Sequence, residues 1–326
     1  MIYGVVIISY NRPHYLERVL KSIQQQTHKD YEIHLFNDGP YDPDVQKCHN
    51  IFEEYFPNGT LHKSLWNLGV CFNYKRAEEF MFDKYDRVIF MADDCTIVPF
   101  YFDWLHLMAE KFNGEKTISC ISGWNDAPAR PLVWQEKNKA ILLGGGYMNM
   151  MMYKRAYEKW KPYMLDYYTL LKNMNTPYIH RNHEDIFKFY HGLGVKVYEN
   201  APGRRHGRVQ YTIGSSQDAM KDISHIMAGL IRIKTGANYC SYIGEYGVHG
   251  RPDWFIKQGM DKEETYPELF TDIEYTKEDI MDIYTSNVDR YMRPDNPVYK
   301  MLLEGSLKDK RAESKNFMKN SLKYSK

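Results

Sequence analysis

The sequence predicts an α/β protein with a mostly parallel central sheet flanked by helices, followed by a C-terminal, mainly helical extension. Three observations predict this class. Short runs rich in β-branched and aromatic residues alternate with amphipathic helical patterns up to about residue 120, as in βαβ units. The length of 326 residues suits one large α/β unit with an appendage. An apolar content of 43% allows a buried core and excludes a disordered or collagen-like chain.

Four runs near the N-terminus have the composition of strands. The helical patterns between them imply right-handed crossovers between parallel strands. In open α/β sheets, ligands bind beyond the carboxyl ends of the strands, so the residues that follow each run are the first candidates for a site. The predicted strands are residues 3–9, 32–37, 87–92 and 117–123.

Three helices are predicted from apolar spacing. The clearest starts at Pro13, which suits a first helical position, and its apolar face carries Leu16, Val19, Leu20 and Ile23. A second is predicted over 71–82, after a turn at Asn67-Leu68-Gly69. A third is predicted over 217–234, where one face carries Ile223, Ile226, Met227, Leu230 and Ile231.

Charge and cysteine content exclude several classes. The 43 Lys and Arg residues nearly cancel the 42 Asp and Glu residues, so the overall charge does not demand nucleic acid or an anionic membrane as a partner. The five cysteines never form C-x-x-C, which argues against a zinc ribbon or a disulfide framework. No signal peptide or transmembrane segment is recognised. The sequence therefore predicts a soluble, cytoplasmic protein.

Polar residues follow three of the predicted strands. Ser9-Tyr10-Asn11-Arg12 comes after the first, Asn37-Asp38-Gly39 after the second, and Asp93-Asp94 after the strand at 87–92. Because parallel strands end at the same edge of a sheet, these three clusters are expected to converge there.

Asp93 and Asp94 end a buried apolar run, where uncompensated carboxylates would be costly. A cation with oxygen preference, Mn²⁺ or Mg²⁺, would satisfy them and complete its shell with water and a diphosphate. The alternative is a surface turn after a strand. Asp38-Gly39 is first of all typical of a turn. The Asp38 carboxylate would also accept a hydrogen bond from a uracil N3–H or a ribose hydroxyl.

The ordered set of these motifs, with Asn67-Leu68-Gly69 between them, resembles the nucleotide-sugar half of the GT-A glycosyltransferases. It is closest to the family-2 type and has features similar to N-acetylglucosaminyltransferase I type enzymes. The resemblance extends over residues 3–210. It implies a GT-A, Rossmann-like domain that binds a nucleotide-sugar together with a divalent cation.

The resemblance also implies which residues form the donor site. Metal ligation would rest mainly on Asp94, because Ala92 stands at the first position of the D-x-D motif. Asp93 and His206 are further candidate ligands, and His249 is a rival to His206. Asn37 stands where many relatives have a second aspartate. Nucleotide-sugar binding is implied for Ser9, Asn11, Arg12, Asp38, Asn67, Gly69, Asp93, Gly145 and Gly146.

Downstream motifs continue the resemblance. Glu184-Asp185, followed by Gly194-Val195-Lys196, is similar to the family's E-D-x₈-G-x-K pattern. This similarity implies Asp185 as the catalytic base, with Glu184 as the second choice. The alternative is a helix N-terminus, where acidic residues favour the dipole without catalysis. Gly144-Gly145-Gly146 is similar to the family's glycine loop or is a plain turn. Acceptor contacts are implied for Trp124, Asn125 and Asp126, with packing alone as the alternative for the tryptophan.

The predicted function is metal-dependent transfer of a sugar from a nucleotide-sugar, with UDP-sugar favoured, to an acceptor hydroxyl with inversion. A glycan or polysaccharide is the favoured acceptor. A modified base in bacteriophage DNA is an alternative, since Arg204, Arg205, Arg208 and a basic tail would meet phosphates. A non-catalytic nucleotide-sugar-binding module is another.

The predicted domain organisation divides the chain at residue 215. A GT-A catalytic domain over 1–215 would comprise a nucleotide-sugar half, 1–125, and an acceptor and catalytic half, 126–215. Residues 216–326 would form the helical extension with the basic tail.

Overall fold

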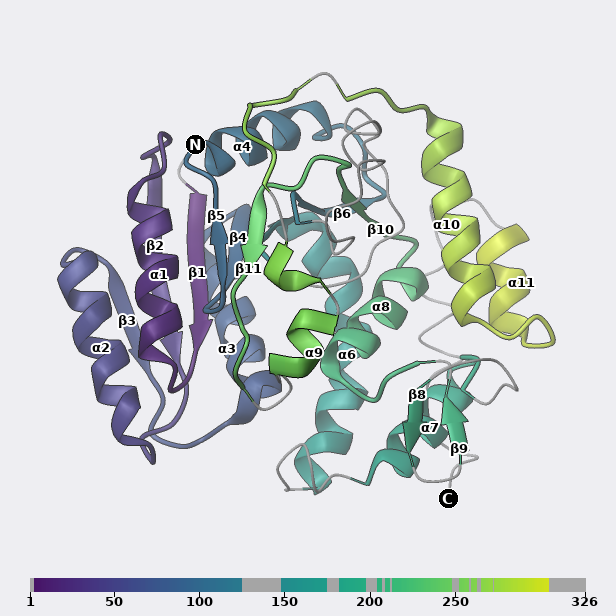
Figure 1. Ribbon diagram of the computed structural model, residues 1–326. Helices are drawn as coiled ribbons and strands as arrows, with labels where there is room; N and C mark the ends of the chain where they lie inside the picture. The colour runs from purple at the N-terminus through teal and green to yellow at the C-terminus, as the bar shows by residue number, and fades with distance from the viewer. Residues whose placement is uncertain are drawn as a thin grey trace. The chain divides into compact units, whose positions relative to one another are not determined.

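The predicted fold class is confirmed by a computed structural model of the chain (Figure 1), a mixed α/β structure with a central sheet flanked by helices and a helical C-terminal region. The chain forms two compact units. The first comprises Met1–Lys154 and Arg232–Tyr275, and the second Arg155–Ile231 and Thr276–Lys326. The residues that the structure describes are 3–124, 148–174, 182–197, 204–206, 209–211, 213–247, 252–257, 259–262, 265–271 and 273–304.

The central sheet has seven strands in the order β10-β6-β7-β4-β1-β2-β3. β1 pairs in parallel with both β2 and β4, and β2 with β3, whereas β7 is antiparallel to β4 and β6. The four predicted strands correspond to β1, β2, β4 and β6. The bounds are β1 Tyr3–Ser9, β2 Tyr31–Asn37, β3 Thr60–Lys63, β4 Arg87–Ala92, β6 Ile118–Ser122, β7 Met150–Tyr153 and β10 Ile231–Lys234.

Local sequence explains where the helices of the first unit begin. Pro13 occupies the first turn of α1, as predicted, and Asp42 caps α2 by accepting from the backbone N–H of Asp44. The helix predicted over 71–82 is α3, which begins at Gly69. The bounds are α1 Pro13–Gln24, α2 Pro43–Tyr55, α3 Gly69–Lys84, α4 Tyr101–Lys111 and α9 Pro252–Lys257, with a 3-10 turn, η2, at Met260–Lys262.

The first unit also contains a small two-stranded sheet, in which β11 (Cys240–Tyr242) pairs antiparallel with β5 (Cys95–Ile97). This pairing brings a segment from late in the sequence beside the residues that follow β4. The core of the unit is mainly apolar, and every residue of β1 is buried. All five cysteines are buried free thiols.

The second unit is mainly helical. Asn182 caps α7, and Thr276 forms a capping box with Asp279 at the start of α10. No helix in the described part of the chain is both long and apolar enough to cross a membrane. The bounds are α6 Lys154–Met174, α7 His183–Gly192, β8 Arg204–His206, β9 Val209–Tyr211, α8 Gln217–Met227, α10 Lys277–Tyr291 and α11 Pro297–Glu304.

The helix predicted over 217–234 was wrong in its second half. Helix α8 ends at Met227, because Gly229 adopts a left-handed conformation with φ 69° and the N–H of Leu230 returns to the carbonyl of His225 at 2.8 Å. These are features of a glycine-based helix stop. The chain then enters β10 at the edge of the central sheet. A short apolar run such as Leu230-Ile231 fits either a helix face or a strand, so spacing alone could not separate the two.

A histidine pair crosses from β2 to β3 in the first unit, and His34 is its buried member. Burial, with a smaller contribution from His62, lowers the pKa of His34 to about 4, so His34 is neutral at pH 7. Tyr85 donates to Glu32 at 2.7 Å and accepts from His34 Nε2 at 2.9 Å, and Nδ1 of the neutral ring then accepts from His62 Nε2 at 3.1 Å.

We expect this pair to make stability depend on pH. An unfolded histidine titrates near 6.5, so between that pH and about 4 the unfolded state binds the extra proton. The stabilisation is complete above pH 6.5 and falls on acidification by an amount on the order of 3 kcal/mol. The free energy of unfolding, measured with urea, should therefore differ less between pH 7.5 and pH 5 in His34→Gln than in the wild type. Equal differences in both proteins would contradict the network.

Candidate functional site

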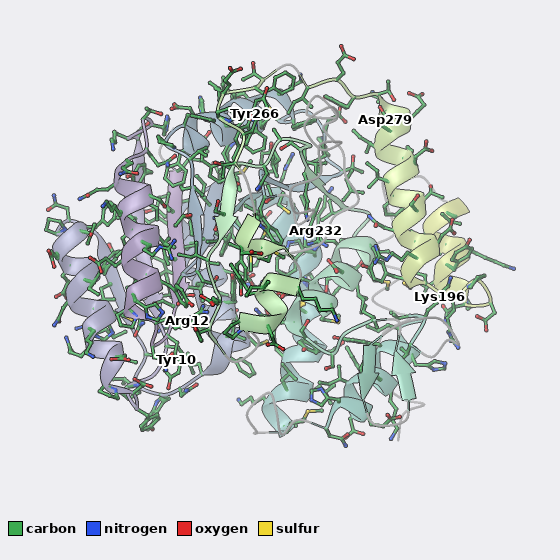
Figure 2. The ribbon with its side chains drawn as sticks, in the orientation of Figure 1. Tyr10, Arg12, Lys196, Arg232, Tyr266 and Asp279 are labelled. Carbon is green, nitrogen blue, oxygen red and sulfur yellow. The ribbon has the colours of Figure 1, made fainter. Side chains whose placement is uncertain are left out.

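The carboxyl ends of β1, β2 and β4 carry the polar clusters that the sequence singled out. In Figure 2, Tyr10 and Arg12 lie just beyond the end of β1. The β1 and β2 ends are joined directly, since the N–H of Asp38 donates to the carbonyl of Ser9 at 2.9 Å. The predicted convergence of Ser9, Asp38 and Asp94 at one edge of the sheet is what the parallel register produces.

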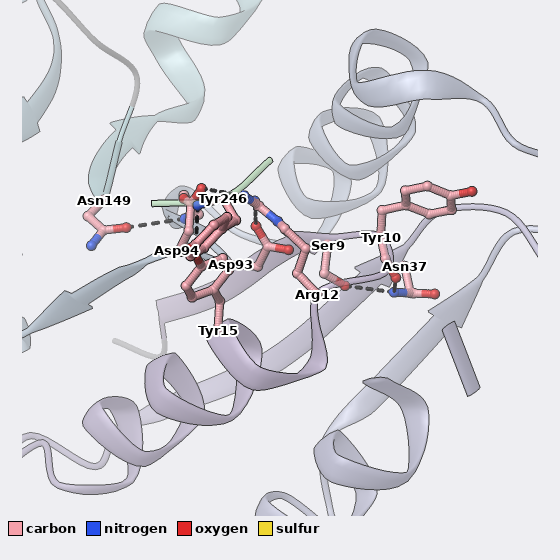
Figure 3. Close-up of polar contacts among 10 residues, drawn as sticks. Ser9, Tyr10, Arg12, Tyr15, Asn37, Asp93, Asp94, Asn149 and Tyr246 are labelled. Atoms are coloured by element: carbon pink, nitrogen blue, oxygen red, sulfur yellow. Dashed lines mark hydrogen bonds and ion pairs between the residues drawn. The ribbon is translucent and has the colours of Figure 1, made fainter. Parts of the chain in front are cut away.

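Asn37 braces the loop after β1. Its amide nitrogen donates to Ser9 Oγ and to the carbonyl of Tyr10, each at 2.8 Å (Figure 3). Its amide oxygen accepts from His49 Nε2 at 3.0 Å. An aspartate could not donate these two bonds, which gives a physical reason for the asparagine. Asn11 is held separately, because its amide donates at 2.8 Å to Asp42, the cap of α2.

Asp38 holds the turn before α3. Its Oδ1 accepts from the N–H of Leu68 at 2.7 Å, and Asn67 Oδ1 accepts from the N–H of Gly69 at 3.0 Å. Gly39 and Gly69 both have positive φ, and a Cβ on Gly39 would lie 2.8 Å from Asn67 Cα. Burial raises the pKa of Asp38, against the lowering effect of the backbone N–H groups. The predicted donor-binding residues of both turns therefore lie together.

Two residues of α3 that the sequence analysis missed complete this edge. Asn73 donates to the carbonyl of Phe36 at 3.0 Å and accepts from Arg76 Nε at 2.8 Å. Arg76 also donates to the carbonyls of Asn37 at 2.9 Å and His62 at 3.0 Å. The guanidinium thus satisfies the carbonyls at the ends of β2 and β3. Asn73 and Arg76 lie one and two helical turns after Gly69, and this spacing was the available signal.

Arg12 bridges the two aspartates that follow β4. Its Nη1 donates to Asp94 Oδ2 at 2.7 Å and its Nη2 donates to Asp93 Oδ1 (Figure 3). The side chains of Asp93 and Asp94 are only 6% and 8% exposed. Burial raises the pKa of Asp93, and Arg12 opposes that rise. Although burial would lower it, the two carboxylates raise the pKa of Arg12 above its usual value. Two carboxylates and one guanidinium leave a net charge of −1.

Asn149 fixes the turn that carries these carboxylates. It is fully buried, has a positive φ of 43°, and lies directly before β7. Its Oδ1 accepts from the N–H of Ala92 at 3.2 Å, and its Nδ2 donates to the carbonyl of Cys95 at 3.0 Å. The side chain therefore clamps both ends of the Asp93-Asp94 turn. Sequence reasoning missed it, because Asn149 comes 57 residues after Ala92.

The segment 240–246 forms part of this site, which the sequence did not indicate. The N–H of Ile243 donates to the carbonyl of Asp94 at 2.8 Å. The N–H of Tyr246 donates to the hydroxyl of Tyr15, also at 2.8 Å (Figure 3). Burial, with the nearby charge of Asp94, raises the pKa of Tyr242. A Cβ on Gly244 would lie 2.6 Å from Asp94 Oδ2. Only a glycine lets this backbone pass the carboxylate.

We expect Gly244→Ala to impair the site more than the fold. The added methyl would meet two side-chain ends, Asp94 Oδ2 at 2.6 Å and the Tyr242 hydroxyl at 2.5 Å, so side chains rather than backbone must move. The free energy of unfolding should fall by about 1 kcal/mol, the low end of what overpacking costs, while nucleotide affinity falls by about 10-fold, the equivalent of 1.4 kcal/mol. Gly114→Ala is the matched control, because nothing lies within 4 Å of its Cβ position. Unchanged affinity in Gly244→Ala would contradict this role.

The structure describes only part of the predicted acceptor and glycine-loop residues. Trp124 is 7% exposed, and Lys234 Nζ lies 5.0 Å from its ring centre, so its ring is packed within the first unit. The positions predicted at Asn125, Asp126, Gly145 and Gly146 lie outside the described residues, as does His249.

Glu184 and Asp185 lie in the first turn of α7, in the second unit. Asp185 accepts from the Asn182 side chain at 2.7 Å and lies 3.6 Å from Lys188 Nζ. Its carboxylate is half-exposed. The helix N-terminus that the sequence analysis weighed as an alternative is therefore present. His206 lies in β8, and its side chain is outside what the structure describes.

The residues around Asp93 and Asp94 fit a divalent cation of the Mg²⁺ or Mn²⁺ type. Such ions are commonly held by one or two carboxylates and complete their shell with substrate phosphates and water. Among the described residues, no group of three His, Cys, Asp or Glu side chains is arranged to hold a metal. The donor set is thus two hard carboxylates carrying a residual negative charge, which suits that pattern and not a closed structural site.

Comparison with known proteins gives one extensive match. The family model described as Glycosyl transferase family 2 matches residues 4–179, which is more than half of the chain. A curated Arabidopsis thaliana protein, alpha-1,3-mannosyl-glycoprotein 2-beta-N-acetylglucosaminyltransferase, is 28% identical over 138 residues. That match covers 38% of this chain and 31% of the relative, so the chain spans about a third of the relative's length.

Solved structures give weaker likenesses. TarS of S. aureus in complex with UDP-GlcNAc has a TM-score of 0.44 and 11% identity, covering 99% of this chain and 72% of that chain. The mannosyltransferase PcManGT from Pyrobaculum calidifontis, in complex with GDP-Man and Mn²⁺, has a TM-score of 0.46 and 13% identity, covering 98% and 85%. Likenesses this distant assign no ligand to this chain.

Proposed function

The chain belongs to glycosyl transferase family 2, and from this premise we propose that it transfers a sugar from a nucleotide-sugar, preferably a UDP-sugar, to an acceptor hydroxyl. The observation that carries the proposal is the convergence of three loops, after β1, β2 and β4, around two buried carboxylates at one edge of the sheet. This edge is where open α/β sheets bind their ligands.

Within this proposal, Asp94 is the main metal ligand and Asp93 assists it. A bound Mn²⁺ or Mg²⁺ would supply stabilisation of the negative charge that develops on the leaving diphosphate. The chain's own part is to hold the carboxylates in place. Asn149 fixes the backbone of their turn, and the segment 240–246 covers Asp94.

The donor's nucleoside is proposed to lie over the loops that Asn37 and Asp38 brace. Ser9, Asn11 and Arg12 belong to the first loop, and Asn67 and Gly69 to the second. Asp38 accepts from backbone N–H groups, so its first task is to shape the surface that the nucleoside would meet.

We propose Asp185 as the general base, with Glu184 as the second choice. Asn182 and Lys188 both contact the Asp185 side chain, which is half-exposed. An ionised carboxylate can accept the proton of the acceptor hydroxyl as the bond to the sugar forms, which predicts inversion at the anomeric carbon. A glycan or polysaccharide remains the favoured acceptor.

A panel of nucleotide-sugars tested by thermal shift, with and without Mn²⁺, examines the proposal. A ligand that binds only the folded state raises the unfolding temperature, by the equivalent of about 2.7 kcal/mol at 100 times its Kd. We expect UDP-sugars to raise the unfolding temperature only when Mn²⁺ is present, and EDTA to reverse this rise. If none of the nucleotide-sugars shifts unfolding under either condition, the proposal fails.

A further inference from the structure

Arg12 occupies both aspartates that a metal would use. It is the last residue before α1, and its guanidinium donates to one oxygen of Asp93 and one of Asp94. Both oxygens face the same cation. A divalent ion ligated by these oxygens would therefore stand within a few ångströms of a guanidinium, and like charges at such distances repel strongly.

Arg12 is also the most exposed of the three side chains. Its side chain is 28% exposed, against 6% and 8% for the aspartates. The backbone that carries the two aspartates is held by Asn149, which bonds Ala92 and Cys95, and by the hydrogen bond from Ile243 to the Asp94 carbonyl. Among the described residues, the guanidinium also lies over the Tyr15 ring, with Arg12 Cζ 5.6 Å from the ring centre. If the cluster rearranges, the guanidinium moves and the carboxylates stay.

A nucleoside diphosphate offers the partner that such a movement needs. Its two phosphates accept a guanidinium's parallel N–H groups as well as carboxylates do. Exchange of partners then keeps every charge paired, with Arg12 on the diphosphate and the divalent cation on Asp93 and Asp94. Without the diphosphate, a metal entering the site would leave Arg12 without a counter-ion.

We infer that Arg12 is an exchangeable internal counter-ion, which excludes divalent metal from Asp93 and Asp94 until a nucleoside diphosphate draws it away. The inference rests on the proposed function and adds an order of binding to it. Metal alone binds weakly, and metal together with the diphosphate binds tightly. Arg12 acts on the metal through the two aspartates, and it is in this sense a positioning residue.

The test measures binding of Mn²⁺ alone, by titration calorimetry and thermal shift, to the full-length wild type and to Arg12→Met. Methionine keeps the length and apolar stem of the side chain but removes the charge. We expect Arg12→Met to bind Mn²⁺ alone at least about 10-fold more tightly than the wild type, and to gain unfolding temperature from Mn²⁺ that the wild type does not gain. UDP should raise the affinity for Mn²⁺ in the wild type and much less in Arg12→Met.

Two further variants keep the result interpretable. Arg87→Met removes a buried arginine paired with Glu110 at the other end of β4, so it loses an ion pair without touching the site and should bind Mn²⁺ alone as the wild type does. Arg12→Lys retains one charge but cannot bridge both carboxylates, so its Mn²⁺ affinity should lie between those of the wild type and Arg12→Met. Arg12→Lys can still be measured if Arg12→Met folds only when Mn²⁺ is added. Such a dependence of folding on Mn²⁺ would itself support the exchange of partners.

Equal affinities of the wild type and Arg12→Met for Mn²⁺ alone would overturn the inference. So would a loss of Mn²⁺ binding in both Arg12 variants. These outcomes are separate from failure of the proposed function, which is read from the wild type with nucleotide-sugar and Mn²⁺ together.

Discussion

Replacing Asp94 with asparagine is expected to abolish Mn²⁺-dependent binding of UDP-sugars. Asparagine has the same shape but no charge, and it offers one neutral oxygen where the carboxylate offered two. Loss of an outer-sphere partner of a metal ligand already costs 10–100-fold in affinity, so loss of the ligand should reduce the Mn²⁺-dependent affinity by more than about 100-fold. Calorimetry with UDP and Mn²⁺ measures this directly.

Glu110→Gln is the matched control for Asp94→Asn. Glu110 also accepts from a buried guanidinium, that of Arg87, but at the opposite end of β4. Both variants lose one charge-assisted pair, and only Asp94→Asn should lose Mn²⁺-dependent UDP binding. Retention of that binding in Asp94→Asn would remove Asp94 as a ligand, whatever the control shows.

Asp185→Asn should keep donor binding and lose sugar transfer. The asparagine oxygen can still accept from Asn182, so α7 keeps its N-terminal contact, but an amide cannot take a proton from the acceptor. A general base contributes about 10²–10⁴ in rate, so kcat should fall by that factor while the donor Kd changes little. Initial rates and donor titrations on the same preparation separate the two quantities.

Asp279→Asn is the control for a purely structural effect. Asp279 occupies the equivalent first-turn position of α10 in the same unit, where it accepts from Thr276 at 2.8 Å. Loss of an acidic residue from a helix N-terminus costs about 0.3–1 kcal/mol of stability. If Asp279→Asn slowed transfer as much as Asp185→Asn, or if Asp185→Asn turned over normally, Asp185 would not be the base.

Much of the first unit could be predicted from local sequence. The runs at 3–9 and 87–92 are apolar and β-branched because both faces of those strands are buried, and such runs are recognisable without tertiary information. The convergence of Ser9, Asp38 and Asp94 followed from one further rule, that parallel strands end at the same edge. The likeness to family 2 followed from the order of these motifs and was confirmed by the family match over residues 4–179.

Contacts between residues far apart in sequence could not be predicted in this way. Arg12 meets Asp94 across 82 positions, and Asn149 meets Ala92 across 57, because the sheet brings their strand ends together. Periodicity records which face of an element is buried, but not what covers it. The same limit explains β10, whose apolar residues continue the spacing of α8 although Gly229 has already ended the helix.

The amino-acid sequence thus specified four strands of the central sheet, the edge that carries the polar loops and the pair of carboxylates, since each depends on residues close together in the chain. Tertiary structure decided the partner of those carboxylates, the clamp on their turn and the return of residues 240–246 to Asp94. These depend on which distant segments become neighbours when the core is buried, and hydrogen bonds and charges then pair with whatever packing has placed beside them.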